Sequence, residues 1–172
     1  MKRLRLIFAA FLLVLQLGCK DNSSSPPQNV CALRLSPAQS EITIGEEITL
    51  TIEAGDFDQP IFALSIRIAY DSAAVDFLAA QLPAQTGFFT DSAICFAQSG
   101  SDVIYLTVTQ IQGQPEVSGS GSIAELTFRG ISTGSSSLEI VSDELHFFNS
   151  AGVEIQIMQI EIGSAVITVS NP

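Results

Sequence analysis

The side chains that could take part in catalysis are few and widely separated in this sequence. His146 is the only histidine of the 172 residues, and it precedes Phe147 and Phe148 with no nucleophile motif nearby. No Gly-x-Ser-x-Gly, His-Glu-x-x-His, phosphate-cradling or redox Cys-x-x-Cys sequence occurs. We therefore predict that the chain has no catalytic residues, that it is not an enzyme, and that His146 has a structural role.

Pairs of carboxylates are a second group of side chains that could catalyse a reaction or bind a metal ion. Asp71 and Asp76 have the residue types of a glycosidase pair. However, Asp71 occupies a turn position, where an Asp side chain commonly bonds its own backbone. Asp56 and Asp58 could hold calcium only loosely, because the ordered series of oxygen ligands of an EF-hand is missing. We predict no metal site and no cofactor.

The cysteines allow two interpretations. Cys31 and Cys95 lie far apart in the sequence, and with a single histidine they do not make a metal site. In an exported chain, an even pair of cysteines suggests a disulfide. Two free thiols are the alternative, and the sequence leaves both open.

The first residues have the pattern of an export signal. A basic start, Met1 to Arg5, precedes an apolar run of residues 6–15 that is too short to span a bilayer comfortably. Residues 15–19, Leu-Gln-Leu-Gly-Cys, resemble a bacterial lipobox, which implies a signal peptide of residues 1–18 and a lipid on Cys19. Gln16 departs from the aliphatic residue usual there, and an ordinary signal peptide is the alternative. Residues 19–30, rich in Ser and Pro, would form a tether.

The charge of the expected mature chain is strongly negative. Without residues 1–18, four Lys and Arg remain against eighteen Asp and Glu, a side-chain net charge of −14. Clustered Lys and Arg are needed to bind nucleic acid or anionic lipid surfaces, so we predict neither function. We expect an exported, membrane-anchored lipoprotein of the outer membrane or cell surface, with one domain at residues 31–172.

Alternating apolar residues recur from Cys31 to the end, and no helical pattern follows the signal segment. In residues 61–70 every second residue, from Phe62 to Tyr70, is large and apolar, while Ser65 and Arg67 fall on the other side. Short strands separated by Gly, Ser, Asp and Pro predict an all-β fold, an antiparallel sandwich or jelly roll. We expect a bulge or turn near Met158, and we expect a short helix or an irregular loop at residues 79–91.

Four segments, in order, resemble a cohesin domain, the extracellular module that holds dockerin-bearing enzymes. They are Gly45-Glu-Glu-Ile-Thr-Leu-Thr-Ile, Ile66-Arg-Ile-Ala-Tyr-Asp-Ser-Ala-Ala-Val-Asp-Phe, Val117-Ser-Gly-Ser-Gly-Ser-Ile-Ala-Glu-Leu-Thr-Phe, and Gly134-Ser-Ser-Ser-Leu with the final Ala165-Val-Ile-Thr-Val. The resemblance implies a nine-stranded jelly-roll sandwich, an architecture shared with carbohydrate-binding modules. It also implies capture of a dockerin-like protein partner, in a context of polysaccharide degradation.

The cohesin resemblance places the partner on one sheet of the sandwich. The outward positions expected on three strands of that sheet are Ser65 and Arg67, Tyr105 and Thr107, and Glu125 and Thr127. Tyr and Arg are frequent interface anchors, although any sandwich strand has outward polar residues. The alternative function is binding of polysaccharide by the same sandwich. An aromatic platform is poorly supported, because the chain has no Trp and Tyr105 is the single ring expected to be exposed.

Overall fold

The computed structural model describes residues 30–84 and 87–172. The expected signal peptide, Cys19 and the tether up to residue 29 therefore lie outside the described residues. Every regular element of the described part is a β-strand, as the sequence predicts. In that same part of the chain, no helix has the length and apolar character needed to cross a membrane.

Sheet A contains five strands in the order β11–β1–β3–β8–β5. Its two long strands, β3 (Glu47–Ile61) and β8 (Val117–Gly130), lie side by side and are antiparallel. The other members are β1 (Cys31–Ser36), β5 (Val75–Gln81) and β11 (Ile160–Ile162).

Sheet B contains seven strands, with β2–β12–β9–β4–β7–β6 in order and β10 attached to β9. Its centre is formed by β9 (Gly134–Phe148), β4 (Ala63–Ala69) and β7 (Val103–Thr109). The remaining strands are β2 (Gln39–Thr43), β6 (Ile94–Gly100), β10 (Glu154–Ile155) and β12 (Ala165–Ser170).

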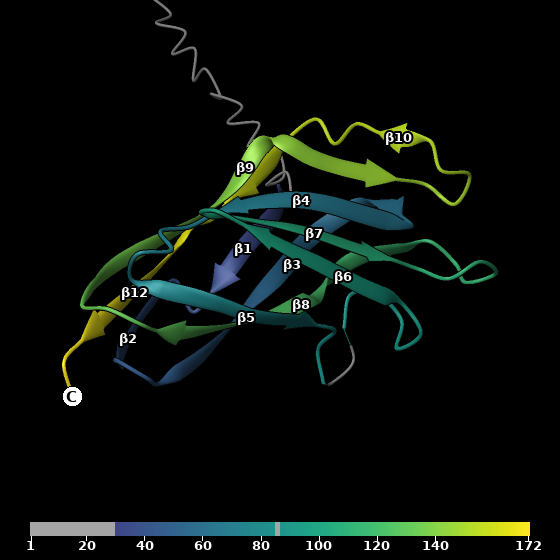
Figure 1. Ribbon diagram of the computed structural model, residues 1–172. Helices are drawn as coiled ribbons and strands as arrows, with labels where there is room; N and C mark the ends of the chain where they lie inside the picture. Colours follow the sequence, from purple (N-terminus) through teal and green to yellow (C-terminus); the bar gives the residue numbers. More distant parts are fainter. Residues whose placement is uncertain (1–29, 85–86) are drawn as a thin grey trace, which may run out of the picture.

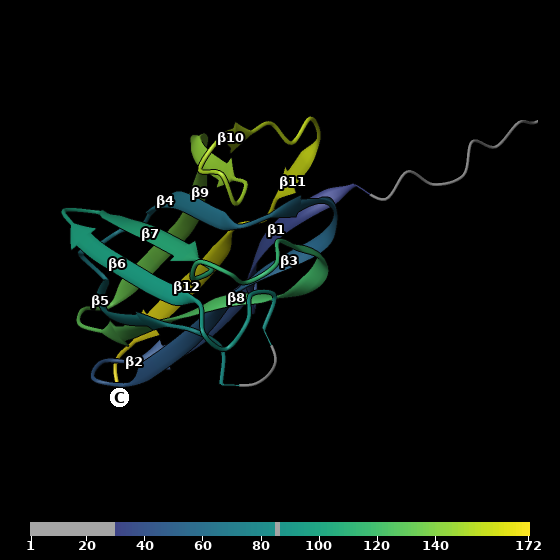
Figure 2. The ribbon, with the colours of Figure 1, turned by 90° about the vertical axis from the view of Figure 1, so that its right-hand side faces the viewer.

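The two sheets pack against each other as a sandwich (Figures 1 and 2). The strands pair antiparallel except at two places, where β1 pairs with β11 and β2 pairs with β12 in parallel. Both exceptions join the start of the described chain to its end, and the C-terminus lies beside β2 in both views. The predicted sandwich is confirmed. The described residues form twelve strands rather than nine, because short segments such as β2, β10 and β11 pair separately.

The core is the apolar layer between the sheets. On β4 the residues Leu64, Ile66 and Ile68 point toward sheet A, and each is at most 2% exposed. Because side chains alternate along a strand, Ser65 and Arg67 must point the other way, into solvent. Sheet A contributes fully buried side chains from its two long strands, namely Leu50, Ile52, Ile123, Leu126 and Phe128.

The sequence predicted a short helix or an irregular loop at residues 79–91. Residues 79–81 instead belong to β5, whereas residues 82–84 and 87–91 are irregular, and the part that begins at residue 87 enters the core. It places Phe88 and Phe89 in the apolar layer, 6% and 4% exposed, with their rings edge to face at 5.2 Å. The loop is held by the Phe88 N–H, which donates to the Ser122 carbonyl at 2.6 Å. A Cβ at Gly121 would lie 3.0 Å from the Phe88 nitrogen, so this position of the Gly-x-Gly motif needs a residue without a side chain.

One detail differs from the sequence pattern and another agrees with it. Phe62 was expected to point inward with the rest of its strand, but it lies half-buried in the β3–β4 turn, outside the core cluster. Residues 153–162 do not form one strand: β10 pairs with sheet B and β11 with sheet A. The chain bends between them at Met158, which is 93% exposed, so the predicted break is confirmed.

The two described cysteines are not bonded to each other. Cys31 is buried on β1 of sheet A, where its thiol lies 3.3 Å from the Asp56 carbonyl oxygen. Cys95 is on β6, an edge strand of sheet B, and burial raises the pKa of its thiol. Both cysteines are free thiols in the structure, which is the second of the two interpretations that the sequence left open.

Phe57 is expected to contribute strongly to stability. Its ring is 2% exposed and packs edge to face on Phe88 at 5.6 Å and on Phe147 at 5.5 Å, joining both sheets and the loop. The Phe57→Ala change should lower the free energy of unfolding by about 3–5 kcal/mol. Phe96→Ala is the matched control, because Phe96 is 62% exposed, and should change it by less than about 1 kcal/mol. Urea unfolding followed by circular dichroism measures both, and equal losses would contradict this description of the core.

Candidate partner-binding face

Four of the six predicted partner-binding residues lie together on the outer face of sheet B. Ser65 and Arg67 are on β4, Tyr105 and Thr107 are on β7, and the strand register places Ser65 opposite Thr107 and Arg67 opposite Tyr105. The four residues therefore form a compact square. The residues next to them on each strand point into the core. A shift of the strand register by one residue would therefore disrupt both the square and the core.

The square is held by contacts among its own side chains and by Glu144 of β9. The hydroxyl oxygens of Ser65 and Thr107 lie 3.3 Å apart. The Arg67 guanidinium lies over the Tyr105 ring, 5.8 Å from its centre, and Nη1 donates to Glu144 Oε1 at 2.6 Å. The hydrogen bond and charge of Glu144, with a smaller contribution from Tyr105, raise the pKa of Arg67. Arg67 is thus oriented before any partner binds.

Strand β9 borders the square on one side and brings acidic groups to it. Ile66 pairs with Leu145 and Ile68 with Ile140, so residues 141–144 form extra length that bulges from β9 and places Glu144 beside Arg67. His146 lies opposite Ser65 and forms a 2.7 Å contact through Nδ1 with Glu154 of β10. This supports a structural role for the histidine, which ties β10 to β9.

Strand β6 borders the square on the other side and exposes large apolar side chains. Ile94 and Phe96 are 55% and 62% exposed, and Phe96 lies opposite Thr107 in the register. Sequence reasoning missed both. Ile94 and Phe96 alternate with Cys95 and Ala97, so apolar residues occupy both sides of this strand and the sequence pattern does not show which side is buried.

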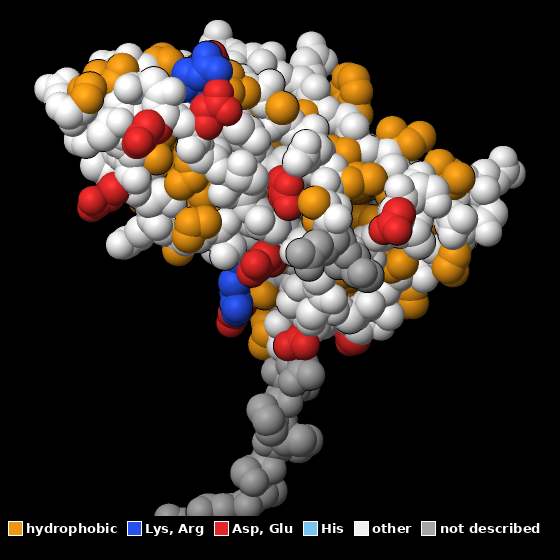
Figure 3. Space-filling view, turned by 90° about the horizontal axis from the view of Figure 1, so that it is seen from below, with side chains coloured by type: hydrophobic (Ala, Val, Ile, Leu, Met, Phe, Trp, Pro, Cys, Tyr) orange, Lys and Arg blue, Asp and Glu red, His pale blue; other side chains and the backbone are white. Residues whose placement is uncertain are grey.

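We call the outer surface of β6, β7, β4 and β9 the docking face. Its centre combines apolar and hydroxyl side chains, and its margin along β9 and β10 is acidic. Tyr105, 48% exposed, links the apolar part to Arg67. The acidic margin consists of Glu139, Asp143, Glu144 and Glu154. Acidic side chains also outnumber basic ones on the part of the surface seen in Figure 3, in keeping with the formal net charge of −11 for the whole chain.

The remaining two predicted residues lie elsewhere. Glu125 and Thr127 are on β8, between β3 and β5 in sheet A, and they point outward from the opposite side of the sandwich. Glu125 accepts a 2.9 Å hydrogen bond from Gln81, and the Thr127 hydroxyl lies 3.3 Å from that of Thr49. The expectation that all six residues share one sheet is wrong, because β8 pairs with β3 and β5 rather than with β4.

The turn at Tyr70-Asp71 has a structural explanation. Asp71 Oδ1 accepts a 2.9 Å hydrogen bond from the Ala73 N–H, as expected for Asp in a turn. Asp102 Oδ1, in the β6–β7 turn, accepts from the hydroxyl of Ser72 at 2.5 Å and from its N–H at 3.1 Å. These bonds lower the pKa of Asp102. Among residues 30–84 and 87–172, no cluster of three or more His, Cys, Asp or Glu side chains could hold a metal ion.

Comparison with known proteins identifies the fold. No protein-family model and no curated protein matches the chain. Among solved structures, the complex of the cohesin CaCohA2 with the dockerin CaDoc0917 contains a chain similar to this one, with a TM-score of 0.66 and 18% identity over 81% of this chain and 99% of that chain. CaCohA2 comes from Clostridium acetobutylicum, and its solution structure is also similar to this chain.

Two further similar structures are cohesins from other organisms. The seventh ScaB type I cohesin of Pseudobacteroides cellulosolvens has a TM-score of 0.63 and 15% identity, over 84% of this chain and 95% of that one. A non-cellulosomal cohesin of the archaeon Archaeoglobus fulgidus has a TM-score of 0.61 and 12% identity, over 84% and 92%. The chain is an all-β sandwich in its architecture. More specifically, it has the cohesin jelly-roll fold, and the resemblance seen in its sequence motifs is confirmed at the level of fold.

The carboxylates that hold the turns should make stability depend on pH. The folded pKa of Asp102 lies below its ordinary value of 3.8, so its stabilising effect is complete above that value and is lost as the pH falls through the folded pKa. Asp102→Asn should therefore lower the free energy of unfolding at pH 7 and flatten its decline below about pH 4. Urea unfolding at several pH values measures this. Asp91→Asn, at an exposed position, is the control, and an unchanged curve for Asp102→Asn would contradict the prediction.

Proposed function

We propose that this chain is a cohesin-like binding module that captures a dockerin-bearing protein on its docking face. The observation that carries the proposal is the exposed group of Ile94, Phe96 and Tyr105 beside the ordered pair of Arg67 and Glu144. Aromatic and Arg side chains at the centre of a patch are the residue types that dominate binding energy. The similarity to cohesins solved in complexes with dockerins supports the choice of partner.

The two sides of the docking face differ in chemistry and so define the partner. The side at β6 offers apolar surface, which favours an apolar contact such as the buried side of a helix or strand. The side at β9 offers carboxylates, among them Glu139 and Glu144, which favour Lys or Arg on the partner. Charge pairs of this kind increase the rate of association and are weakened by salt. We infer a partner with an apolar contact surface flanked by basic side chains.

We infer that sheet B binds a partner and does not catalyse a reaction. The inference rests on the cohesin fold and on the docking face. The alternative of polysaccharide binding through Tyr105 gains no support from the docking face. The Arg67 guanidinium lies over the Tyr105 ring, 5.8 Å from its centre, so that side of the ring is not free for a sugar to stack on. We therefore assign the docking face to a protein.

The docking face is tested by a matched pair of Arg substitutions. Arg67 pairs with Glu144 on sheet B, and Arg129 pairs with Glu47 on sheet A, so both are half-exposed arginines in ion pairs on outer faces. With purified dockerin modules from the same genome, Arg67→Ala and Phe96→Ala should each weaken binding about tenfold or more. Arg129→Ala should leave it unchanged.

Isothermal titration calorimetry on the purified chain measures these affinities. The proposal is abandoned if no dockerin of the genome binds. It is also abandoned if Arg67→Ala and Arg129→Ala weaken binding equally, because that result would place the partner away from sheet B.

We further propose that a lipid on Cys19 anchors the module outside the cytoplasm, with residues 19–30 as the tether. The motivation is the sequence pattern alone: a basic start, an apolar run and the lipobox-like Leu-Gln-Leu-Gly-Cys. One lipid-modified cysteine with its attached chains holds a protein at a membrane surface without a spanning helix.

The anchor is tested by fractionation of cells that express the full chain. Cys19→Ser should move the protein from the membrane fraction to the soluble fraction, because it removes the acceptor of the lipid. Cys95→Ser is the matched control, since Cys95 lies within the sandwich, and it should leave the protein at the membrane. Retention of the Cys19→Ser protein would refute the anchor.

A further inference from the structure

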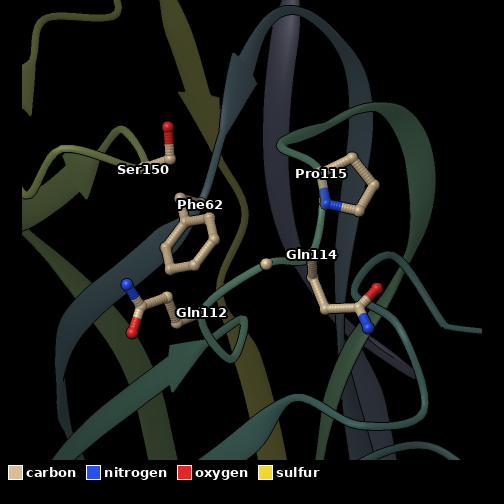
Figure 4. Close-up of a pocket in the computed structure, with 6 residues that line it drawn as sticks. Phe62, Gln112, Gln114, Pro115 and Ser150 are labelled. Carbon is tan, nitrogen blue, oxygen red and sulfur yellow. The ribbon is translucent and has the colours of Figure 1, made fainter.

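A pocket of about 640 Å³ opens at one end of the sandwich, where three connections between strands meet. It is lined by Phe62 of the β3–β4 turn, by residues 112–115 of the β7–β8 loop and by Ser150 of the β9–β10 turn. Figure 4 shows the Phe62 ring between Ser150 and Gln112, with Gln114 and Pro115 farther along the loop. The volume falls within the range of about 300–1,000 Å³ that is typical of small-molecule sites.

The β7–β8 wall of this pocket is held by a buried polar side chain. Gln110 is 2% exposed, its Oε1 accepts a 2.6 Å hydrogen bond from the Thr90 hydroxyl, and its Nε2 donates to the Pro115 carbonyl at 3.4 Å. The Gln110 N–H donates to the Phe62 carbonyl at 3.0 Å. Because a buried amide left without partners is costly, these bonds fix the loop relative to the Phe62 turn.

The opposite wall is held by a carboxylate. Glu116 Oε1 accepts hydrogen bonds from both the N–H and the hydroxyl of Ser150, each 2.8 Å long, and these bonds lower the pKa of Glu116. The Phe62 N–H donates to the Phe148 carbonyl at 2.7 Å. All three connections are therefore tied together before a ligand binds, so the pocket is preorganised.

The chemistry of the lining selects a neutral ligand. The described residues that line the pocket are one phenyl ring, one proline, two glutamines, a glycine and a serine, and none of them is charged. An anionic ligand would meet no cation there, and the chain's net charge of −11 would oppose its approach. The only anion beside the lining that these contacts identify is Glu116, and its Oε1 is already engaged by Ser150, so a cationic ligand would be poorly paired in the pocket.

A sugar ring matches this lining. Its C–H face can pack on the exposed part of the Phe62 ring. Its hydroxyls can donate to or accept from the amide of Gln112, and they can donate to the hydroxyl oxygen of Ser150. The Ser150 hydroxyl donates a hydrogen bond to Glu116, so its oxygen is left to accept a hydrogen bond from a ligand. We infer that this pocket binds the terminal pyranose units of a neutral oligosaccharide, independently of the protein partner on the docking face.

Nuclear magnetic resonance titration of the labelled chain tests this assignment. Cellohexaose, xylohexaose, mannohexaose and galactohexaose are the probes, each up to about 10 mM because single-pocket sugar binding is weak. At least one probe should cause saturable shifts of the side-chain NH2 signals of Gln112 and Gln114. Phe62→Leu, which keeps an apolar side chain but removes the ring, should weaken that binding at least about fivefold. Gln112→Ala should also weaken it.

Gln98→Ala, at an exposed position of the docking face, is the matched control for Gln112→Ala and should leave sugar binding unchanged. Absence of saturable shifts with all four probes would overturn the inference. Shifts confined to Phe96, Tyr105 and their neighbours would overturn it as well, since they would place the sugar on the docking face. Dockerin affinity of Phe62→Leu should equal that of the unmodified chain, which separates this test from that of the proposed function.

Discussion

The structure depends above all on the two-residue period of β4, because this strand must satisfy the core and the surface at once. Leu64, Ile66 and Ile68 are almost completely buried against sheet A. A shift of the pairing by one residue would expose all of them and bury Arg67, which would cost several kilocalories per mole in lost apolar burial and in desolvation of a charge. The register of β4 with β7 and β9 is therefore fixed by the core. The positions of Ser65 and Arg67 on the docking face follow from that register.

The two ends of the sandwich are closed by different interactions. At one end Asp71, Ser72 and Asp102 join the turns that lead out of β4 and into β7. At the other end Gln110 and Glu116 join the loops around the pocket. Hydrogen bonds from backbone and hydroxyl groups of Ser72 and Ser150 lower the pKa values of Asp102 and Glu116, so both carboxylates are charged at neutral pH and keep these contacts. The apolar layer gives the strands their register, and these polar contacts position the loops.

The docking face and the end pocket belong to one rigid sandwich but present different chemistry. The docking face offers exposed aromatic and aliphatic side chains beside an ordered arginine and an acidic margin, which matches a protein surface. The pocket offers one ring and neutral hydrogen-bonding groups in a concave site. A module that holds a protein on one side and a glycan end at another would keep the captured protein close to a polysaccharide. Such an arrangement would raise the local concentration of the captured protein near the polysaccharide.

The sequence by itself determined the class of fold and half of the docking face. Alternation is a local property, so residues 61–70 and 103–110 alone showed that Ser65, Arg67, Tyr105 and Thr107 point away from the core. The tertiary structure decided everything that depends on which strands are neighbours. It placed Glu125 and Thr127 on the opposite sheet, separated Cys31 from Cys95, and exposed Phe96 on an edge strand whose two sides are both apolar. Pairing between strands distant in sequence is set by the packing of the whole core, and no local pattern contains that information. The end pocket was also decided by the tertiary structure, because its lining comes from three connections that only the folded sandwich brings together.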